Sequence, residues 1–223
     1  MIALNTLLLS VLKVWNSMLD RLPFQHIWIV DFEFIAKEGE RPDPVCMVAF
    51  EVRSGTYLML WRDELTSLNS PPFDTTANSL FVAFYSSAEL GCFLALNWPM
   101  PERILDLYVE FLAETNGHTI IANRSLVGAL LHYGLPTIGA DAKDSKRNSI
   151  QFGGPWNEQG KREILDCCQS HVDALLPLLN QLEAFTEVSA FFLEKKQERN
   201  LSQPQPINKL FQHKENLMVK SQP

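Results

Sequence analysis

Two carboxylates stand two residues apart near the end of an apolar run, residues 26–34, whose sequence is HIWIVDFEF. A run of β-branched and aromatic residues predicts a buried strand, and alternate side chains of a strand point to the same face. Asp31 and Glu33 would therefore lie side by side. Burying two carboxylates is costly unless cations share the site, and hard divalent metals prefer oxygen ligands. The pair predicts a metal platform, and the alternative is two solvated acids at the end of a strand.

Three further polar side chains fall in predicted helices. Glu89 lies in the first turn of a helix predicted over residues 86–97, where by itself it is an acid that interacts with the helix dipole. Cys167 and His171 are four residues apart in a long predicted helix, which places them on one face. Because a lone histidine on a helix is more often a structural residue, His171 alone leaves both interpretations open.

A basic and aromatic stretch precedes that long helix. Lys146 and Arg147 come shortly before Trp156, and such groups hold a single-strand backbone and stack a base in nucleic-acid-binding proteins. The alternative is a solvated loop.

The elements that must position these residues follow from the spacing of apolar residues and turns. Two more strand-like runs, residues 44–52 and 56–65, follow the first with a turn at residues 53–55, which predicts a three-strand antiparallel meander. A short apolar strand is expected over residues 80–85, and helices over residues 86–97 and 124–133. A long helix starts after Asn157 and runs to about residue 185, with a kink expected at Pro177. Strands followed by alternating strand and helix predict an α/β or α+β domain.

Three segments then show a resemblance to a known family. Asp31-Phe32-Glu33, the residues 82–90 (VAFYSSAEL) and the residues 165–172 (LDCCQSHV) fall in the order and spacing of the three motifs of DEDD 3′–5′ exonucleases. The chain is most similar to the exonuclease domain of bacterial DNA polymerase I-like (family A) proteins, over roughly residues 28–182. The resemblance implies a ribonuclease H-like fold, a mixed sheet with the three-strand antiparallel meander and flanking helices.

The same resemblance implies a site with two Mg²⁺ or Mn²⁺ ions that hydrolyses a 3′-terminal phosphodiester. It assigns metal binding to Asp31, Glu33, Glu89 and His171, and makes these residues and Cys167 the candidate catalytic group. Glu89 replaces the usual Asp and keeps its charge. The third motif departs further, because His171 stands where the family has an Asp ligand and Cys167 where it has a Tyr that orients water. Asp106 is expected to shape the cleft without being a ligand.

Composition limits the class of protein. The 223 residues are 46% hydrophobic with a formal charge of −7, which excludes a disordered chain and a disulfide miniprotein and argues against a broad basic face. The four cysteines show no disulfide or zinc spacing, so we expect reduced thiols and a cytoplasmic location.

The chain is expected to have three parts. Residues 1–24 would form a peripheral helix whose apolar segment is too short to span a membrane, residues 25–194 the ribonuclease H-like exonuclease domain, and residues 195–223 a flexible tail with six basic and two acidic residues.

The sequence therefore predicts a 3′–5′ exonuclease domain that acts on single-stranded DNA or another nucleic-acid 3′ end and contacts no membrane. Polymerase motifs are not seen after residue 185, so a polymerase segment would lie on another chain. The alternative is a catalytically impaired nucleic-acid-binding or structural remnant of a polymerase I-like protein, because two positions of the third motif have changed.

Overall fold

The computed structural model describes residues 22–37, 39–118, 123–138 and 150–182. The described residues from 24 onward belong to one compact unit, Phe24–Thr186. The expected N-terminal helix, apart from its last residues, and the expected basic tail lie outside these ranges. Among the described helices, none is both long enough and apolar enough to cross a membrane.

A five-stranded mixed sheet forms the centre of the unit, in the order β3-β2-β1-β4-β5. β1 (His26–Ile35), β2 (Asp43–Glu51) and β3 (Thr56–Trp61) pair antiparallel. β4 (Ser79–Ala83) lies parallel to β1, and β5 (Ile104–Asp106) lies parallel to β4. The expected mixed sheet with a three-strand antiparallel meander is thus confirmed. The carboxyl ends of β1, β4 and β5 meet at one edge of the sheet, where side chains from separate segments come together.

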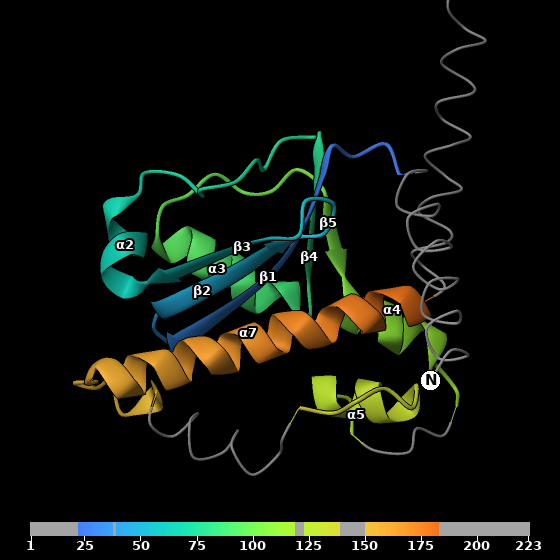
Figure 1. The fold of residues 1–223 in the computed structure, drawn as a ribbon. Helices are drawn as coiled ribbons and strands as arrows, with labels where there is room; N and C mark the ends of the chain where they lie inside the picture. The colour runs from blue at the N-terminus through green and yellow to red at the C-terminus, as the bar shows by residue number, and fades with distance from the viewer. Residues whose placement is uncertain (1–21, 38, 119–122, 139–149, 183–223) are drawn as a thin grey trace, which may run out of the picture. The chain divides into compact units, whose positions relative to one another are not determined.

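Helices cover both faces of this sheet (Figure 1). The long helix α7 (Glu158–Gln181) packs on β1 and β2, and α3 (Ser86–Ala95) lies behind the sheet in the same view. Alternation along β1 sends Trp28, Val30 and Phe32 into the apolar core shared with Phe93 of α3, while Asp31 faces α7. Because period-2 alternation decides which face a side chain takes, the two carboxylates of β1 are directed to the α7 side.

Shorter helices complete the described part of the unit. They are α2 (Arg62–Ser67), α4 (Leu107–Glu114) and α5 (Leu126–His132). The helix expected over residues 124–133 is α5, and its N-cap Ser125 accepts a hydrogen bond from the Gly128 amide.

Two expected strands are shorter than the apolar runs that predicted them. The third strand ends at Trp61, and α2 begins at Arg62 because the Glu64 carboxylate accepts the Trp61 amide at 2.8 Å, as in a capping box. β4 ends at Ala83 because Tyr85 takes a left-handed backbone conformation with φ of 68°. Local capping and turn chemistry therefore overrode the apolar pattern at both strand ends.

The two helices beside the site start where expected. α3 begins at Ser86 and ends at Ala95, before Asn97, whose φ of 57° is left-handed. In α7 the Asn157 side chain accepts the Gly160 amide at 2.8 Å, and the helix continues through Pro177 to Gln181. The helix thus ends short of the expected end near residue 185, because Leu182 takes an extended backbone conformation.

Candidate active site

Asp31 and Glu33 lie on the face of β1 that α7 covers, near the carboxyl end of the strand. Their side chains are 17% and 18% exposed. The β1–β2 register shifts directly after Glu33, which pairs with Cys46 while Phe34 pairs with Pro44. Such bulges redirect the strand end and its side chains. The two carboxylates are therefore held close together at the edge of the sheet with little access to water.

His171 of α7 reaches both carboxylates. Its Nδ1 lies 3.2 Å from Asp31 Oδ2 and 3.6 Å from Glu33 Oε1, and the side chain is 13% exposed. Burial lowers the pKa of the imidazole, but the charges of Asp31 and Glu33 and hydrogen bonds with Asp31 and Cys167 raise it more, to about 10. At neutral pH His171 thus carries a positive charge beside the two carboxylates.

The two adjacent cysteines of α7 take different places. Cys167, one helical turn before His171, is partly buried, and its sulfur, a His171 nitrogen and a Glu33 oxygen all lie within 4.8 Å of one another. Cys168 is buried and donates its thiol to the Asp31 carbonyl oxygen at 3.2 Å and to Oδ2 at 3.3 Å. Sequence reasoning did not select Cys168, although its spacing of three residues from His171 places both on one helix face.

Glu89 enters the site from the first turn of α3. The residue is 3% exposed, and its Oε2 accepts the Phe32 amide, the residue between the two acids, at 3.0 Å. Burial, and then the negative charge of Asp31, raise the pKa of Glu89 well above its ordinary value. The buried carboxyl group therefore holds its proton more tightly than a glutamate in water does.

Asp106, at the end of β5, joins the starts of two helices. Oδ1 accepts the amides of Tyr85 and Tyr108 at 2.9 and 3.0 Å, and Oδ2 accepts the Ser86 amide and hydroxyl at 2.8 and 2.7 Å. Through these bonds Asp106 shapes the site, and its expected absence from the metal ligands stays a prediction. The carboxylate is fully used by α3 and α4, so it fixes the position of Glu89 one turn further along α3.

Tyr85 is a residue that sequence reasoning missed. It is the N-cap of α3, the residue is 53% exposed, and its ring meets the Tyr108 ring edge-on at 5.2 Å. A non-glycine residue in a left-handed conformation is strained, and such strain is concentrated at functional sites. The sequence signal that could have identified Tyr85 is its position, since it is an aromatic residue directly before a helix start and four residues before Glu89.

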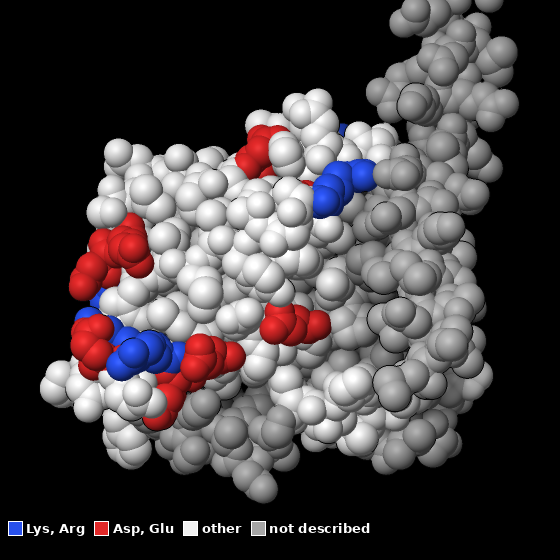
Figure 2. Space-filling view, viewed as in Figure 1, with Lys and Arg blue, Asp and Glu red and all other residues white. Residues whose placement is uncertain are grey.

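The predicted nucleic-acid contacts are described only in part. Lys146 and Arg147 lie outside the described residues. The Trp156 ring meets Trp61 edge-on at 5.6 Å, and the Arg62 guanidinium lies 5.7 Å from its centroid. The Trp156 indole Nε1 is buried without a hydrogen-bond partner among the described residues. On the face shown in Figure 2, acidic and basic side chains are mixed.

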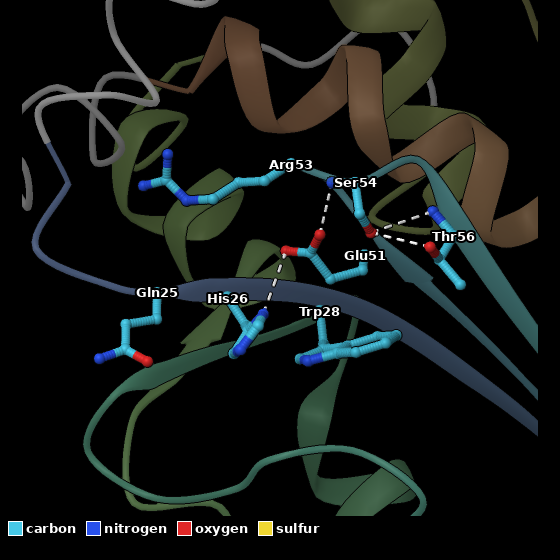
Figure 3. A pocket seen from close by; sticks show the side chains of 7 residues that line it. All are labelled: Gln25, His26, Trp28, Glu51, Arg53, Ser54 and Thr56. Atoms are coloured by element: carbon cyan, nitrogen blue, oxygen red, sulfur yellow. Dashed lines mark hydrogen bonds and ion pairs between the residues drawn. The ribbon is translucent and has the colours of Figure 1, made fainter.

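A pocket of about 430 Å³ lies at the opposite, amino end of β1 (Figure 3). Glu51 in its wall accepts the Ile27 amide at 3.1 Å and the Ser54 amide at 2.6 Å. Burial raises the pKa of Glu51, but hydrogen bonds from Ser54 and Ile27 lower it more, so the pKa lies below its ordinary value. These bonds close the β2–β3 turn onto β1, which gives the carboxylate a structural role away from Asp31.

The donor set at the carboxyl end of β1 fits a divalent cation. Asp31 and Glu33 supply carboxylate oxygens, and the positive charge of His171 already occupies the space between them. Glu89 adds a third carboxyl group, held beside Asp31 by its bond to the Phe32 amide. The helix contributes sulfur and nitrogen in place of the carboxylate that the resemblance implies, so the fit is to a cation with a mixed donor set.

The chain is similar to several solved structures. Ribonuclease D of Trypanosoma brucei, in a complex with RNA U12, has a TM-score of 0.50 and 16% identity, over 76% of this chain and 59% of that one. Ribonuclease D of Escherichia coli has a TM-score of 0.49 and 17% identity, over 85% of this chain and 46% of that one. The Nibbler EXO domain of Aedes aegypti has a TM-score of 0.47 and 16% identity, over 78% and 90%.

The described unit thus has the α/β fold of the Trypanosoma brucei ribonuclease D structure, and the expected ribonuclease H-like fold class is confirmed. The chain covers less than two thirds of either ribonuclease D chain. No protein-family model matches the chain, and a comparison with curated proteins finds no match.

Proposed function

We propose that the chain is a nucleic-acid-binding domain that hydrolyses 3′-terminal phosphodiesters in the 3′–5′ direction with divalent metal ions, Mg²⁺ or Mn²⁺. One observation carries this proposal. Asp31, Glu33, Glu89 and His171 come from three separate segments and meet at one edge of the sheet. The fold by itself does not specify an activity, so the convergence of these groups is the main support.

Each residue has a definable part in this proposal. Asp31 and Glu33 hold cations at the end of β1, and Glu89, fixed by the Phe32 amide, adds a carboxyl group from α3. When bound, divalent ions in such sites activate a water and stabilise the charge of the leaving oxygen. The Cys168 thiol holds Asp31 in place through two contacts. Cys167 and His171 complete the site from α7.

Aromatic residues supply the proposed contact with single-stranded nucleic acid. Tyr85 presents an exposed ring one helical turn before Glu89, and stacking on such rings tolerates any base. Lys146, Arg147 and Trp156 are proposed to hold the backbone and a further base, as expected from their types.

The kind of nucleic acid is the finer part of the proposal. The motif resemblance to polymerase I-like proteins favours single-stranded DNA, with a polymerase segment on another chain as a proposed partner. The ribonuclease D of Trypanosoma brucei was solved with RNA, which makes RNA the substrate to compare. A cytoplasmic location is proposed because all four cysteines are free.

A second function, binding a 3′ end without cutting it, is favoured by the ion pair between His171 and Asp31. In the metal-free protein the imidazolium supplies the positive charge that a cation otherwise brings. A site neutralised in this way holds its carboxylates together without a metal ion. Such a metal-free site could bind a 3′ end without hydrolysing it.

The experiment uses 5′-labelled DNA and RNA oligonucleotides of one sequence, each with a free or a blocked 3′ end. Metal-dependent shortening of the free 3′ ends by the wild type, absent in Asp31→Asn, is the expected result. Asp63→Asn, an exposed carboxylate of α2, is the matched control and should behave as the wild type. Binding without shortening supports the second function, and neither binding nor shortening rejects both.

A further inference from the structure

The helix side of the site carries two donor atoms that hard cations do not favour. Cys167 and His171 lie one turn apart on α7, and their sulfur and nitrogen lie with a Glu33 oxygen within 4.8 Å of one another. All three residues are partly buried. A small movement of these side chains brings a sulfur, a nitrogen and an oxygen onto one ion.

This donor set distinguishes between classes of metal. Mg²⁺ requires near-octahedral oxygen ligands and keeps several waters. Zn²⁺ binds Cys, His and carboxylate ligands, and its catalytic sites use three protein ligands with one position left open. Imidazole and thiolate ligands select borderline-soft ions over Mg²⁺.

We propose that Glu33, Cys167 and His171 form a three-ligand site for one borderline-soft divalent ion of the Zn²⁺ class. These three residues belong to the proposed active site, and the inference specifies which class of metal binds there. Only the biological use of the metal rests on the proposed function. Asp31, whose Oδ2 is 3.2 Å from His171 Nδ1, contributes negative charge beside the ion. The open position is the place for a water or a substrate oxygen.

Cobalt gives a readout that does not depend on activity. The full chain, freed of metal with a chelator and dialysed, is titrated with Co²⁺, which serves as a spectroscopic substitute for Zn²⁺. We expect visible absorption of low-coordinate Co²⁺ together with a near-ultraviolet charge-transfer band from the thiolate. An equimolar amount of Zn²⁺ should remove both signals, and a large excess of Mg²⁺ should leave them.

Matched variants assign the ligands. Cys167→Ser should lose the charge-transfer band and weaken Zn²⁺ binding by at least about 10-fold, the lower range for losing even an outer partner of a metal. His171→Gln should weaken binding likewise, whereas His26→Gln, at the far end of β1, should bind as the wild type. Thermal melting in chelator shows whether each variant is folded. If Cys167→Ser proves unfolded, the Zn²⁺ and Mg²⁺ affinities of folded His171→Gln test the site instead. Weaker Zn²⁺ binding supports the proposal, and an unchanged Zn²⁺ affinity overturns it.

The outcomes separate this inference from the proposed function. A charge-transfer band that persists in Cys167→Ser, or displacement of Co²⁺ by Mg²⁺, overturns the metal class even if oligonucleotides are shortened. A thiolate-bound ion in a chain that neither binds nor shortens oligonucleotides supports the metal site and rejects the proposed function.

Discussion

His171 Nδ1 lies 3.2 Å from Asp31 Oδ2, and the two residues are 140 positions apart in the chain. This contact joins α7 to the end of β1 and places a cation beside two carboxylates. Because the imidazole has a pKa of about 10, the site is charged differently with and without metal. The first two predictions follow from that difference.

Stability should depend on pH through His171. The pKa is about 10 in the folded protein against an ordinary value of 6.5, so the stabilisation is fully present below pH 6.5 and is lost as pH rises toward 10. We expect His171→Gln to lower the free energy of unfolding by about 3 kcal/mol at pH 6, as for a broken buried ion pair. Urea unfolding in chelator should show the difference shrinking by pH 10, and a difference independent of pH would contradict the ion pair.

Manganese should stabilise the folded protein in competition with the His171 proton. An ion that binds only the folded state raises the Tm, and His171 must lose its proton to bind it. Millimolar Mn²⁺ should therefore raise the Tm of the wild type more at pH 8.5 than at pH 6, and should leave Asp31→Asn unchanged. Equal shifts in Asp31→Asn and in the control Asp63→Asn would place the ion elsewhere.

Glu89→Gln should separate folding from metal binding. Because the pKa of Glu89 is raised in the folded protein, the wild type loses stability as pH rises above the ordinary value of 4.5. A glutamine oxygen still accepts the Phe32 amide and carries no charge. We expect Glu89→Gln to equal or exceed the wild type in stability at pH 7, with the advantage gone at pH 4, while the Mn²⁺-induced rise in Tm decreases. Clear destabilisation at pH 7 would show that Glu89 is ionised.

At position 85 a glycine variant should be more stable than an alanine variant, the reverse of the usual order of stability. At φ of 68° a residue other than glycine is strained by about 1 kcal/mol. Tyr85→Gly should therefore be more stable than Tyr85→Ala by about that amount in urea unfolding. Both should bind a single-stranded oligonucleotide about 10-fold more weakly than the wild type, since one base loses its stacking partner.

Tyr85→Phe is the control for that pair, because it keeps the ring and should keep the affinity. Equal affinities for Tyr85→Gly and the wild type would remove Tyr85 from the proposed nucleic-acid contact.

His171→Asp tests whether the third motif has decayed or adapted. Aspartate restores a hard oxygen ligand and a negative charge, so Mg²⁺ binding measured by calorimetry should strengthen, and adding Cys167→Tyr should improve the orientation of the attacking water. If the motif has decayed, shortening of oligonucleotides in Mg²⁺ should appear only in these variants. If the motif has adapted, the wild type should already shorten oligonucleotides in Mn²⁺, and His171→Ala should abolish that activity. Full activity of the wild type in Mg²⁺ that His171→Ala does not change would contradict both decay and adaptation.

Much of the framework was determined by local sequence patterns. The alternation in residues 26–34 sends Asp31 and Glu33 to one face whatever packs against it, and the Asn157 side chain starts α7 through a bond three residues away. The separation of four residues puts Cys167 and His171 on one side of that helix. These properties depend on neighbours within a few residues, so the sequence alone determined them.

Only the tertiary structure decided the chemical state of the site. The Cys168 thiol bonds Asp31 across 137 positions, and Glu89 accepts the Phe32 amide across 57. The proton on His171 depends on two carboxylates from another segment, and the left-handed Tyr85 is held by Asp106 from β5. Burial and charge act through space rather than along the chain, so these properties arise only when the sheet and α7 come together.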